Sequence, residues 1–244
     1  MSKPVLTKPA PRSDIIKSVC VFCGSHNGAD PIYVEQAKIL GHQLANQGYR
    51  LVFGGGSVGV MGAIAQGVLE KGGSVLSVVP ETLYKQGSRQ LGDVVVVKDM
   101  HERKKTMAKE SDAFVVLPGG KPCRKSYVVF LTLPCSPLIF AMIGYGTFEE
   151  MLEMITWSQL NIHSKPIILL NTKNYFGLFV QWIHHCIQEK FVPEGNAEIF
   201  CVAETIDEVL ASLISYQAPS TRYGFSWAEE QDQKDQQAEN ASLM

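Results

Sequence analysis

The feature that most constrains the fold is a repeated alternation between short apolar runs and longer amphipathic segments. Runs such as 18–23 and 113–117 are apolar throughout instead of alternating with polar residues. That pattern is typical of strands in a parallel sheet, which helices cover on both faces. Because strand-like and helix-like segments take turns along the chain, we predict an α/β fold with a Rossmann-like, doubly wound parallel sheet flanked by helices.

The strands and helices can be placed from apolar periodicity and from end signals such as the capping box at 205–208. The expected strands are 18–23, 50–53, 74–79, 94–97, 113–117, 166–170 and 199–202. The expected helices are 31–47, the residues after Gly62 as far as 71, 100–110, 147–160, 175–190 and 205–214. The polar stretch 81–92 is expected to be a mobile loop over a site.

These elements form one expected domain, 18–216, between polar tails at 1–17 and 217–244 that are expected to be disordered. The chain has 244 residues, of which 45% are hydrophobic, and a formal charge of −2. This balance supports a sizeable core but gives no electrostatic reason to expect nucleic acid or a membrane surface as a partner. The six cysteines and the absence of a secretory apolar region favour a cytoplasmic protein, with the nucleus also open.

Cys20 and Cys23 have the C-x-x-C spacing of metal and redox sites. In a strand, however, their side chains point to opposite faces, and the sequence has no second such pair to complete a zinc site. We therefore predict that both are small core residues, and we expect neither a metal nor a cofactor.

Three glycine-containing turns follow expected strands and therefore share one edge of the sheet. They are Gly24-Ser25, the run 54–62 and Gly119-Gly120. Ligands in such sheets bind beyond the carboxyl ends of the strands, and glycine N–H groups beside a helix N-terminus suit a phosphate. Taken alone, the run 54–62 is equally consistent with a tight strand–helix turn.

Three adjacent cations, Arg103, Lys104 and Lys105, lie near the start of an expected helix. Two interpretations are open: a solvated charged face, or a site for an anion that offsets their unfavourable position on the helix dipole. Glu150 is similarly ambiguous, because Thr147 to Glu150 has the T-x-x-E pattern of a capping box. Glu153 is expected to be a solvated charge.

Together, these motifs resemble the LOG ("Lonely guy") family of cytokinin riboside 5′-monophosphate phosphoribohydrolases. The matching phrases are FCGS at 22–25, GGGxxGxMG at 54–62, MHERK at 100–104, PGG at 118–120, YGTFEE at 145–150 and ITW at 155–157. The likeness covers about Val19 to Ile214, apart from an interruption between the two glycine-rich phrases. Family members often carry the label "lysine decarboxylase", but no motif here suggests a lysine-bound pyridoxal phosphate.

The resemblance implies that a homodimer hydrolyses the N-glycosidic bond of a nucleoside 5′-monophosphate, adenosine-type and N6-substituted, to free base and ribose 5-phosphate. It implies that Arg103 and Glu150 are the catalytic pair, which favours catalysis over capping for Glu150. The implied substrate contacts are Gly24, Ser25, Gly55, Gly56, Met61, Gly62, Lys104, Gly119, Gly120, Gly144, Tyr145, Gly146, Thr147, Glu149 and Thr156. An acidic substrate contact of plant members has no obvious match, since Lys85 occupies that place in an ungapped alignment.

Such chemistry suits the residues. Breaking a ribosyl C–N bond builds oxocarbenium character on the sugar, which a nearby carboxylate can stabilise while it orients or deprotonates water. The phosphate, held by glycine N–H groups and a cation, would anchor the substrate and position the bond.

The interruption needs its own explanation. Removal of 24 residues, 120–143, restores the uninterrupted family phrase. We hypothesise that 121–143 is a translated intron, because its boundaries permit codons that contain splice signals; a genuine inserted loop is the alternative. We expect the segment to push the two halves of the motif apart, so that the chain as written hydrolyses nucleotide poorly or not at all.

Two other functions compete with the phosphoribohydrolase. One is a nucleotide-binding protein without catalysis, and the other is a glycosidase for another purine nucleotide, of molybdenum-cofactor or GMP type.

Overall fold

The computed structural model describes residues 16–87, 89–119 and 145–224. They form one seven-stranded sheet in which every pairing is parallel, with the strand order β4-β3-β2-β1-β5-β6-β7. The strands are β1 (Ser18–Phe22), β2 (Arg50–Phe53), β3 (Val75–Pro80), β4 (Asp93–Val97), β5 (Ala113–Val116), β6 (Ile167–Leu170) and β7 (Cys201–Ala203). The predicted doubly wound parallel sheet is therefore confirmed.

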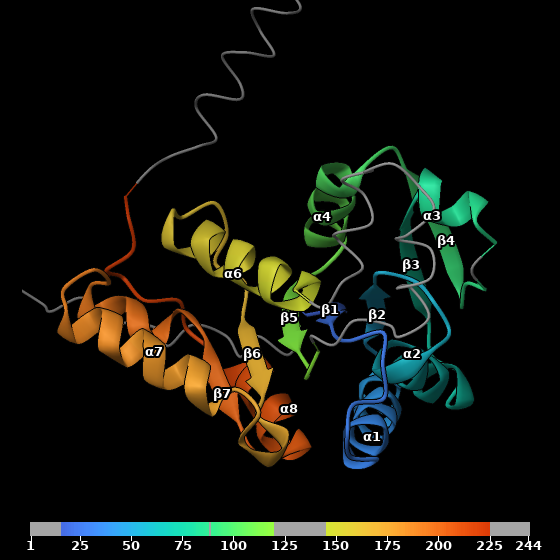
Figure 1. Cartoon of the computed structure of the whole chain (residues 1–244), viewed down its shortest axis with the longest axis horizontal. Coiled ribbons are helices and arrows are strands. Elements are labelled where there is room, and N and C mark those ends of the chain that lie inside the picture. Colours follow the sequence, from blue (N-terminus) through green and yellow to red (C-terminus); the bar gives the residue numbers. More distant parts are fainter. Residues whose placement is uncertain (1–15, 88, 120–144, 225–244) are drawn as a thin grey trace, which may run out of the picture.

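Helices cover both faces of this sheet (Figure 1). The α-helices are α1 (Ile32–Asn46), α2 (Gly59–Glu70), α3 (Glu81–Lys85), α4 (Met100–Lys109), α6 (Gly146–Gln159), α7 (Gly177–Gln188) and α8 (Ile206–Ser215), and two 3-10 helices are η4 (Thr172–Asn174) and η5 (Glu194–Ile199). One apolar cluster joins α1, α2 and α8 to the sheet, and a second joins α4, α6 and the start of α7 to the opposite face.

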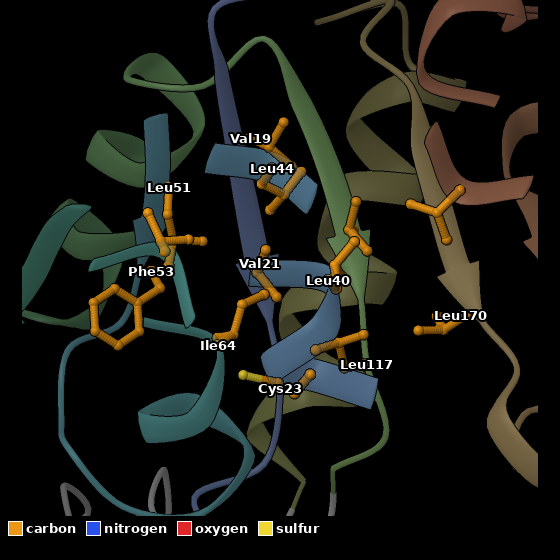
Figure 2. Packing of buried hydrophobic residues seen from close by; sticks show 14 of the residues in the cluster. Val19, Val21, Cys23, Leu40, Leu44, Leu51, Phe53, Ile64, Leu117 and Leu170 are labelled. Carbon is orange, nitrogen blue, oxygen red and sulfur yellow. The ribbon is translucent and has the colours of Figure 1, made fainter. Parts of the chain in front are cut away.

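The strands that are apolar throughout supply both clusters, as expected for a sheet buried on two sides. Figure 2 shows Leu40 and Ile64, from α1 and α2, over Val21 of the central strand β1. Cys23 lies in this cluster and Cys20 in the other, so the prediction of two core cysteines on opposite faces is confirmed. Within the described part of the chain, no group of three or more His, Cys, Asp or Glu side chains could hold a metal ion.

Several element boundaries differ from the prediction. Helix α2 begins at Gly59, inside the expected glycine turn, and α7 begins at Gly177, two residues later than expected. The expected loop over 81–92 begins with the short helix α3, and the last strand starts at Cys201 because Ile199 ends η5. Among the helices of the described residues, none is long and apolar enough to cross a membrane.

The domain also reaches slightly beyond the expected limits of 18 and 216. Ile16 is buried in the core at the amino-terminal end. At the other end, the backbone N–H of Tyr223 donates to the carbonyl of Gln159. The remainder of the two expected disordered tails, 1–15 and 225–244, lies outside the described residues.

The connections change direction between β1 and β5. From β1 the chain winds through β2 and β3 to β4 at one edge, and from β5 it winds through β6 to β7 at the other. The carboxyl ends of β1 and β5 therefore mark the topological switch point, where α/β sheets of this kind bind their ligands.

Candidate active site

The predicted glycine turns meet at this switch point. The N–H of Gly24, after β1, donates to the carbonyl of Pro118, after β5, at 3.3 Å. The carbonyl of Gly24 accepts from the N–H of Met61, in the first turn of α2, at 3.2 Å. Turns that follow three different strands thus touch through their backbones, as their shared edge predicts.

The two halves of the interrupted motif also lie together. A Cβ atom at Gly119 would collide with the Oγ1 atom of Thr147, so the end of β5 and the start of α6 are in direct contact. The expectation that the intervening segment pushes the halves apart is wrong for these two residues. Gly120, Gly144 and the segment 121–143 lie outside the described residues.

A charged contact between two largely buried side chains joins α4 to α6 in this site. The Nη1 atom of Arg103 donates to Oε1 of Glu150 at 2.9 Å, and the two side chains are only 12% and 10% exposed. The Nε atom of Arg103 donates to the carbonyl of Val78, in β3, at 3.2 Å. A Cβ atom at Gly54 would overlap the guanidinium, which explains why a glycine follows β2 at this position. Arg103 is therefore fixed in orientation by three separate elements.

Burial raises the pKa of the Glu150 carboxyl, and the charge of Arg103 opposes this increase. The carboxyl thus combines a raised proton affinity with a partner that favours its ionised form, which is a common arrangement for acid–base groups in active sites. The capping-box alternative is not what the structure has. Helix α6 begins at Gly146 with Tyr145 as its N-cap residue, and Glu150 points to Arg103.

A second charged contact surrounds Lys104, whose side chain is 7% exposed. Its Nζ atom pairs with Glu149 and, at 2.9 Å, with Glu153. Burial alone would lower the pKa of Lys104, but the two carboxylates raise it. The solvated-face interpretation is therefore wrong for Arg103 and Lys104, although Lys105 is exposed, and Glu153 is an ion-pair partner, not a free charge.

The unfavourable placement of cations at the start of α4 is offset within the helix itself. Asp99 caps α4, because its carboxylate accepts from the N–H of Glu102 at 2.8 Å. Glu102 in turn accepts from the N–H of Lys98 at 2.7 Å. These carboxylates complement the positive end of the helix dipole, so the cations do not by themselves require an anionic ligand.

The remaining predicted contacts lie in three places. Gly55 and Gly56 have positive φ angles, and Gly56 N–H donates to the side chain of Gln90 at 2.8 Å. Four other predicted contacts belong to the turns and helix starts at the same edge of the sheet. They are Ser25, Gly62, Tyr145 and Gly146. Thr156 is separate: it lies six residues beyond Glu150 on α6, about 9 Å along the axis, and its hydroxyl donates to Leu152.

Sequence reasoning missed two side chains that border the site. The Tyr175 hydroxyl donates to the carbonyl of Gly119, and its ring stacks with Phe148 at 6.4 Å between centroids. Gln90, in the expected loop over the site, binds the Gly56 N–H. Neither residue belongs to a recognisable motif, and the expected mobile loop was the one available signal for Gln90.

The fold and this edge define an α/β protein with a buried Arg–Glu pair beside glycine turns, and comparison with known proteins makes the class specific. A family model described as "possible lysine decarboxylase" matches residues 61–122 and 137–213, with a break inside the interruption. A probable cytokinin riboside 5′-monophosphate phosphoribohydrolase of Oryza sativa subsp. japonica is 41% identical over 81% of this chain and 79% of its own length. An Arabidopsis thaliana cytokinin riboside 5′-monophosphate phosphoribohydrolase is 39% identical over 82% of both chains.

The chain therefore belongs to the LOG family, as its motifs indicate. Solved structures add support for the fold alone. The molybdenum cofactor carrier protein of Chlamydomonas reinhardtii matches with a TM-score of 0.55 and 19% identity over 81% of this chain and 95% of its own. The molybdenum cofactor binding protein of Rippkaea orientalis matches with a TM-score of 0.53 and 19% identity, over 82% of this chain and 98% of its own.

Proposed function

We propose that this chain hydrolyses the N-glycosidic bond of an adenosine-type nucleoside 5′-monophosphate, with N6-substituted AMP as the preferred class. The products are the free base and ribose 5-phosphate. The observation that carries the proposal is the buried contact between Arg103 and Glu150 beside the glycine turns. The names of the curated relatives give the same activity for those proteins.

Glu150 supplies the reactive carboxylate in this proposal. Leaving-group departure makes the ribose ring cationic, and a carboxylate close to the anomeric carbon stabilises that charge and orients the attacking water. Arg103 holds the carboxylate in one orientation and favours its ionised form. Water then attacks the anomeric carbon and gives a proton to the Glu150 carboxylate, and the departing base gains one proton, so that the products are the free base and ribose 5-phosphate.

The phosphate would lie at the glycine turns, where backbone N–H groups and the start of α6 converge. Gly24, Met61 and Gly119 belong to turns that already touch one another. Thr147, at the N-terminal turn of α6, adds a hydroxyl next to Gly119. Such an anchor uses binding energy far from the scissile bond to position that bond.

A second candidate, nucleotide binding without catalysis, follows from the position of the interruption. Residues 120–143 separate the glycines of the phosphate motif in sequence, although Gly119 and Thr147 remain in contact. We expect a form lacking these 24 residues to hydrolyse nucleotide faster than the full chain, because the motif is then continuous.

The test is to incubate the purified 244-residue chain, and the form without 120–143, with AMP, N6-substituted AMP and GMP, and to measure free base and ribose 5-phosphate. The proposal expects both products in equal amounts, with the adenine-type nucleotides preferred. Bound nucleotide without base release in either form would support the second candidate. Equal rates for the two forms would reject the role assigned to the interruption.

We further propose that the protein is a cytoplasmic homodimer. Cys20, Cys23, Cys186 and Cys201 are free thiols, as suits a reducing compartment. Leu178 and Trp182 on α7 are 81% and 55% exposed, and such apolar surface is typical of protein interfaces. Light scattering coupled to size-exclusion chromatography tests the dimer, and a monomer at micromolar concentration would exclude it.

A further inference from the structure

The two helices that carry the candidate active-site charges are each held at the opposite, C-terminal end by a cation. For α4, the Nζ atom of Lys165 donates to the carbonyls of Ala108 and Ser111, both at 2.6 Å. For α6, the Nη1 atom of Arg222 donates to the carbonyl of Ser158 at 3.2 Å. Carbonyls at helix C-termini lack intrahelical partners, and cations there also complement the helix dipole.

Arg222 does more than cap one helix. Its other donors reach the carbonyls of His163, at 2.8 Å, and Pro219, at 2.9 Å, and the hydroxyl of Ser164, at 3.0 Å. A planar guanidinium with a fixed fork of donors suits four acceptors held in one place, and a lysine could not satisfy all of them.

The same turn after α6 links the two cations. His163 Nε2 lies 3.1 Å from the carbonyl of Met154, and its Nδ1 atom accepts from the N–H of Lys165 at 3.2 Å. Burial lowers the pKa of His163 to about 4, so the ring is neutral at pH 7 and can accept at Nδ1 while donating at Nε2. The turn is therefore fixed to α6 by His163 and to α4 by Lys165.

Burial also lowers the pKa of Lys165. Removing an ammonium from water costs free energy, which two short hydrogen bonds, to a carbonyl in the last turn of α4 and to one just beyond it, offset. An apolar side chain would be easier to bury at position 165. The presence of a lysine there therefore indicates that its hydrogen bonds to the end of α4 help to place that helix.

We propose that Lys165 and Arg222 are positioning residues, which together form a brace that sets α4 against α6 so that Arg103 meets Glu150. Arg103 lies five residues before Ala108 on α4, and Glu150 eight residues before Ser158 on α6, so the spans are about 8 and 12 Å. A helix is stiff over such lengths, and fixing one end therefore fixes the other. The consequence for catalysis rests on the proposed function.

The experiment compares Arg222→Met, Arg222→Lys and Lys165→Met in the 244-residue chain with Lys38→Met as a matched control. Lys38 forms an exposed ion pair with Glu70, between α1 and α2, and touches neither α4 nor α6. Hydrogen–deuterium exchange at Glu149 to Met154 is one readout. The other is the rate and pH profile of base release from AMP, measured well below each melting temperature.

The brace predicts faster exchange at Glu149 to Met154 in both methionine variants, and a kcat lowered about tenfold or more. In Arg222→Met, this segment begins about 12 Å from the altered end of α6. It also predicts that the acid limb of the pH profile moves upward, because Glu150 loses part of its contact with Arg103, and that Arg222→Lys recovers part of each loss. Faster exchange confined to 156–164, with an unchanged pH profile, would reduce the two cations to local caps and overturn the proposal.

The experiment distinguishes a failure of the proposed hydrolase function from a failure of the brace. If the unaltered chain releases no base, the proposed function fails, and exchange at Glu149 to Met154 still decides whether the brace exists. If Lys165→Met does not fold, Arg222→Met and Arg222→Lys carry the same test from the other cation. A variant that exchanges like Lys38→Met at Glu150 contradicts the brace in either case.

Discussion

The two helical layers of this protein differ in the contacts that their helices make with each other. Helices α1 and α2 approach each other at glycines: a Cβ atom at Gly41 would collide with the carbonyl of Ile64, and one at Gly67 with the carbonyl of Lys38. Helices α4 and α6, on the other face, meet through the buried pair Arg103–Glu150. Both layers pack on the sheet through apolar side chains, but α1 and α2 touch through their backbones, whereas α4 and α6 share a buried charged contact.

This difference separates a scaffold from a site. Close apolar packing does not change with pH, whereas the contact between α4 and α6 changes with the protonation of Glu150. A buried ion pair is also weak evidence for stability, because desolvation opposes its attraction. Among the described residues, the ion pairs with a buried member join α4 to α6, and chemistry at the sheet edge explains this placement better than folding does.

The largest expected effect on stability comes from breaking the charged layer. Arg103→Met leaves the Glu150 carboxylate buried without its cation, which costs about 3–5 kcal/mol of unfolding free energy at pH 7. Urea titration measures this change. The double variant Arg103→Met/Glu150→Leu should recover most of the loss, and a double variant no more stable than the single one would contradict this explanation.

A smaller effect is expected in the glycine layer. Gly67→Val forces a side chain against the carbonyl of Lys38 and should cost about 1–3 kcal/mol, because α1 and α2 must separate. Base release per folded molecule should not change. Gln66→Val, on the exposed side of the same helix, is the control and should stay within about 0.5 kcal/mol of the unaltered chain.

The charged contact between α4 and α6 should also make activity and stability depend on pH. Because burial raises the pKa of Glu150, the acid limb of kcat/KM should have its midpoint above the usual carboxyl value of about 4.5. The folded state holds this proton more tightly than the unfolded state, so Glu150 should lower the unfolding free energy as pH rises from about 4.5 through its folded pKa. A midpoint at or below 4.5 would show that Glu150 is not the titrating group.

The smallest effect is expected for the exposed ion pair between α1 and α2. Lys38 and Glu70 are 45% and 47% exposed, and water and salt screen exposed pairs of this kind so that they add little to stability. Lys38→Met should therefore change the melting temperature little at any salt concentration. A loss comparable to that of Arg103→Met would mean that charge, and not close packing, also holds the glycine layer.

The sequence predicts the architecture well, because fully apolar strands and glycine turns act locally. The shared edge of Gly24, Met61 and Gly119 follows from the parallel topology alone. The burial of Lys104 and its contact with Glu153 could not be predicted, since they depend on how close α4 comes to α6. A sequence pattern gives the face of a helix but not its distance from its neighbour.

Two further contacts could not be predicted from local sequence patterns. The contact of Gly119 with Thr147 persists across the interruption because β5 and α6 are each anchored by their own apolar residues. Arg222 lies in a polar stretch that resembles a disordered tail, yet its side chain joins four acceptors around the end of α6. Composition describes the average of such a stretch and conceals a single residue with fixed partners.

Glu150→Gln asks whether Glu150 is the reactive carboxylate of a nucleotide N-glycosidase. Base release from AMP and AMP affinity by calorimetry are measured on the same preparation. We expect base release to fall by about a thousandfold, while the affinity for AMP stays close to that of the unaltered chain. Base release that survives the substitution, or is lost only together with AMP binding, would contradict it.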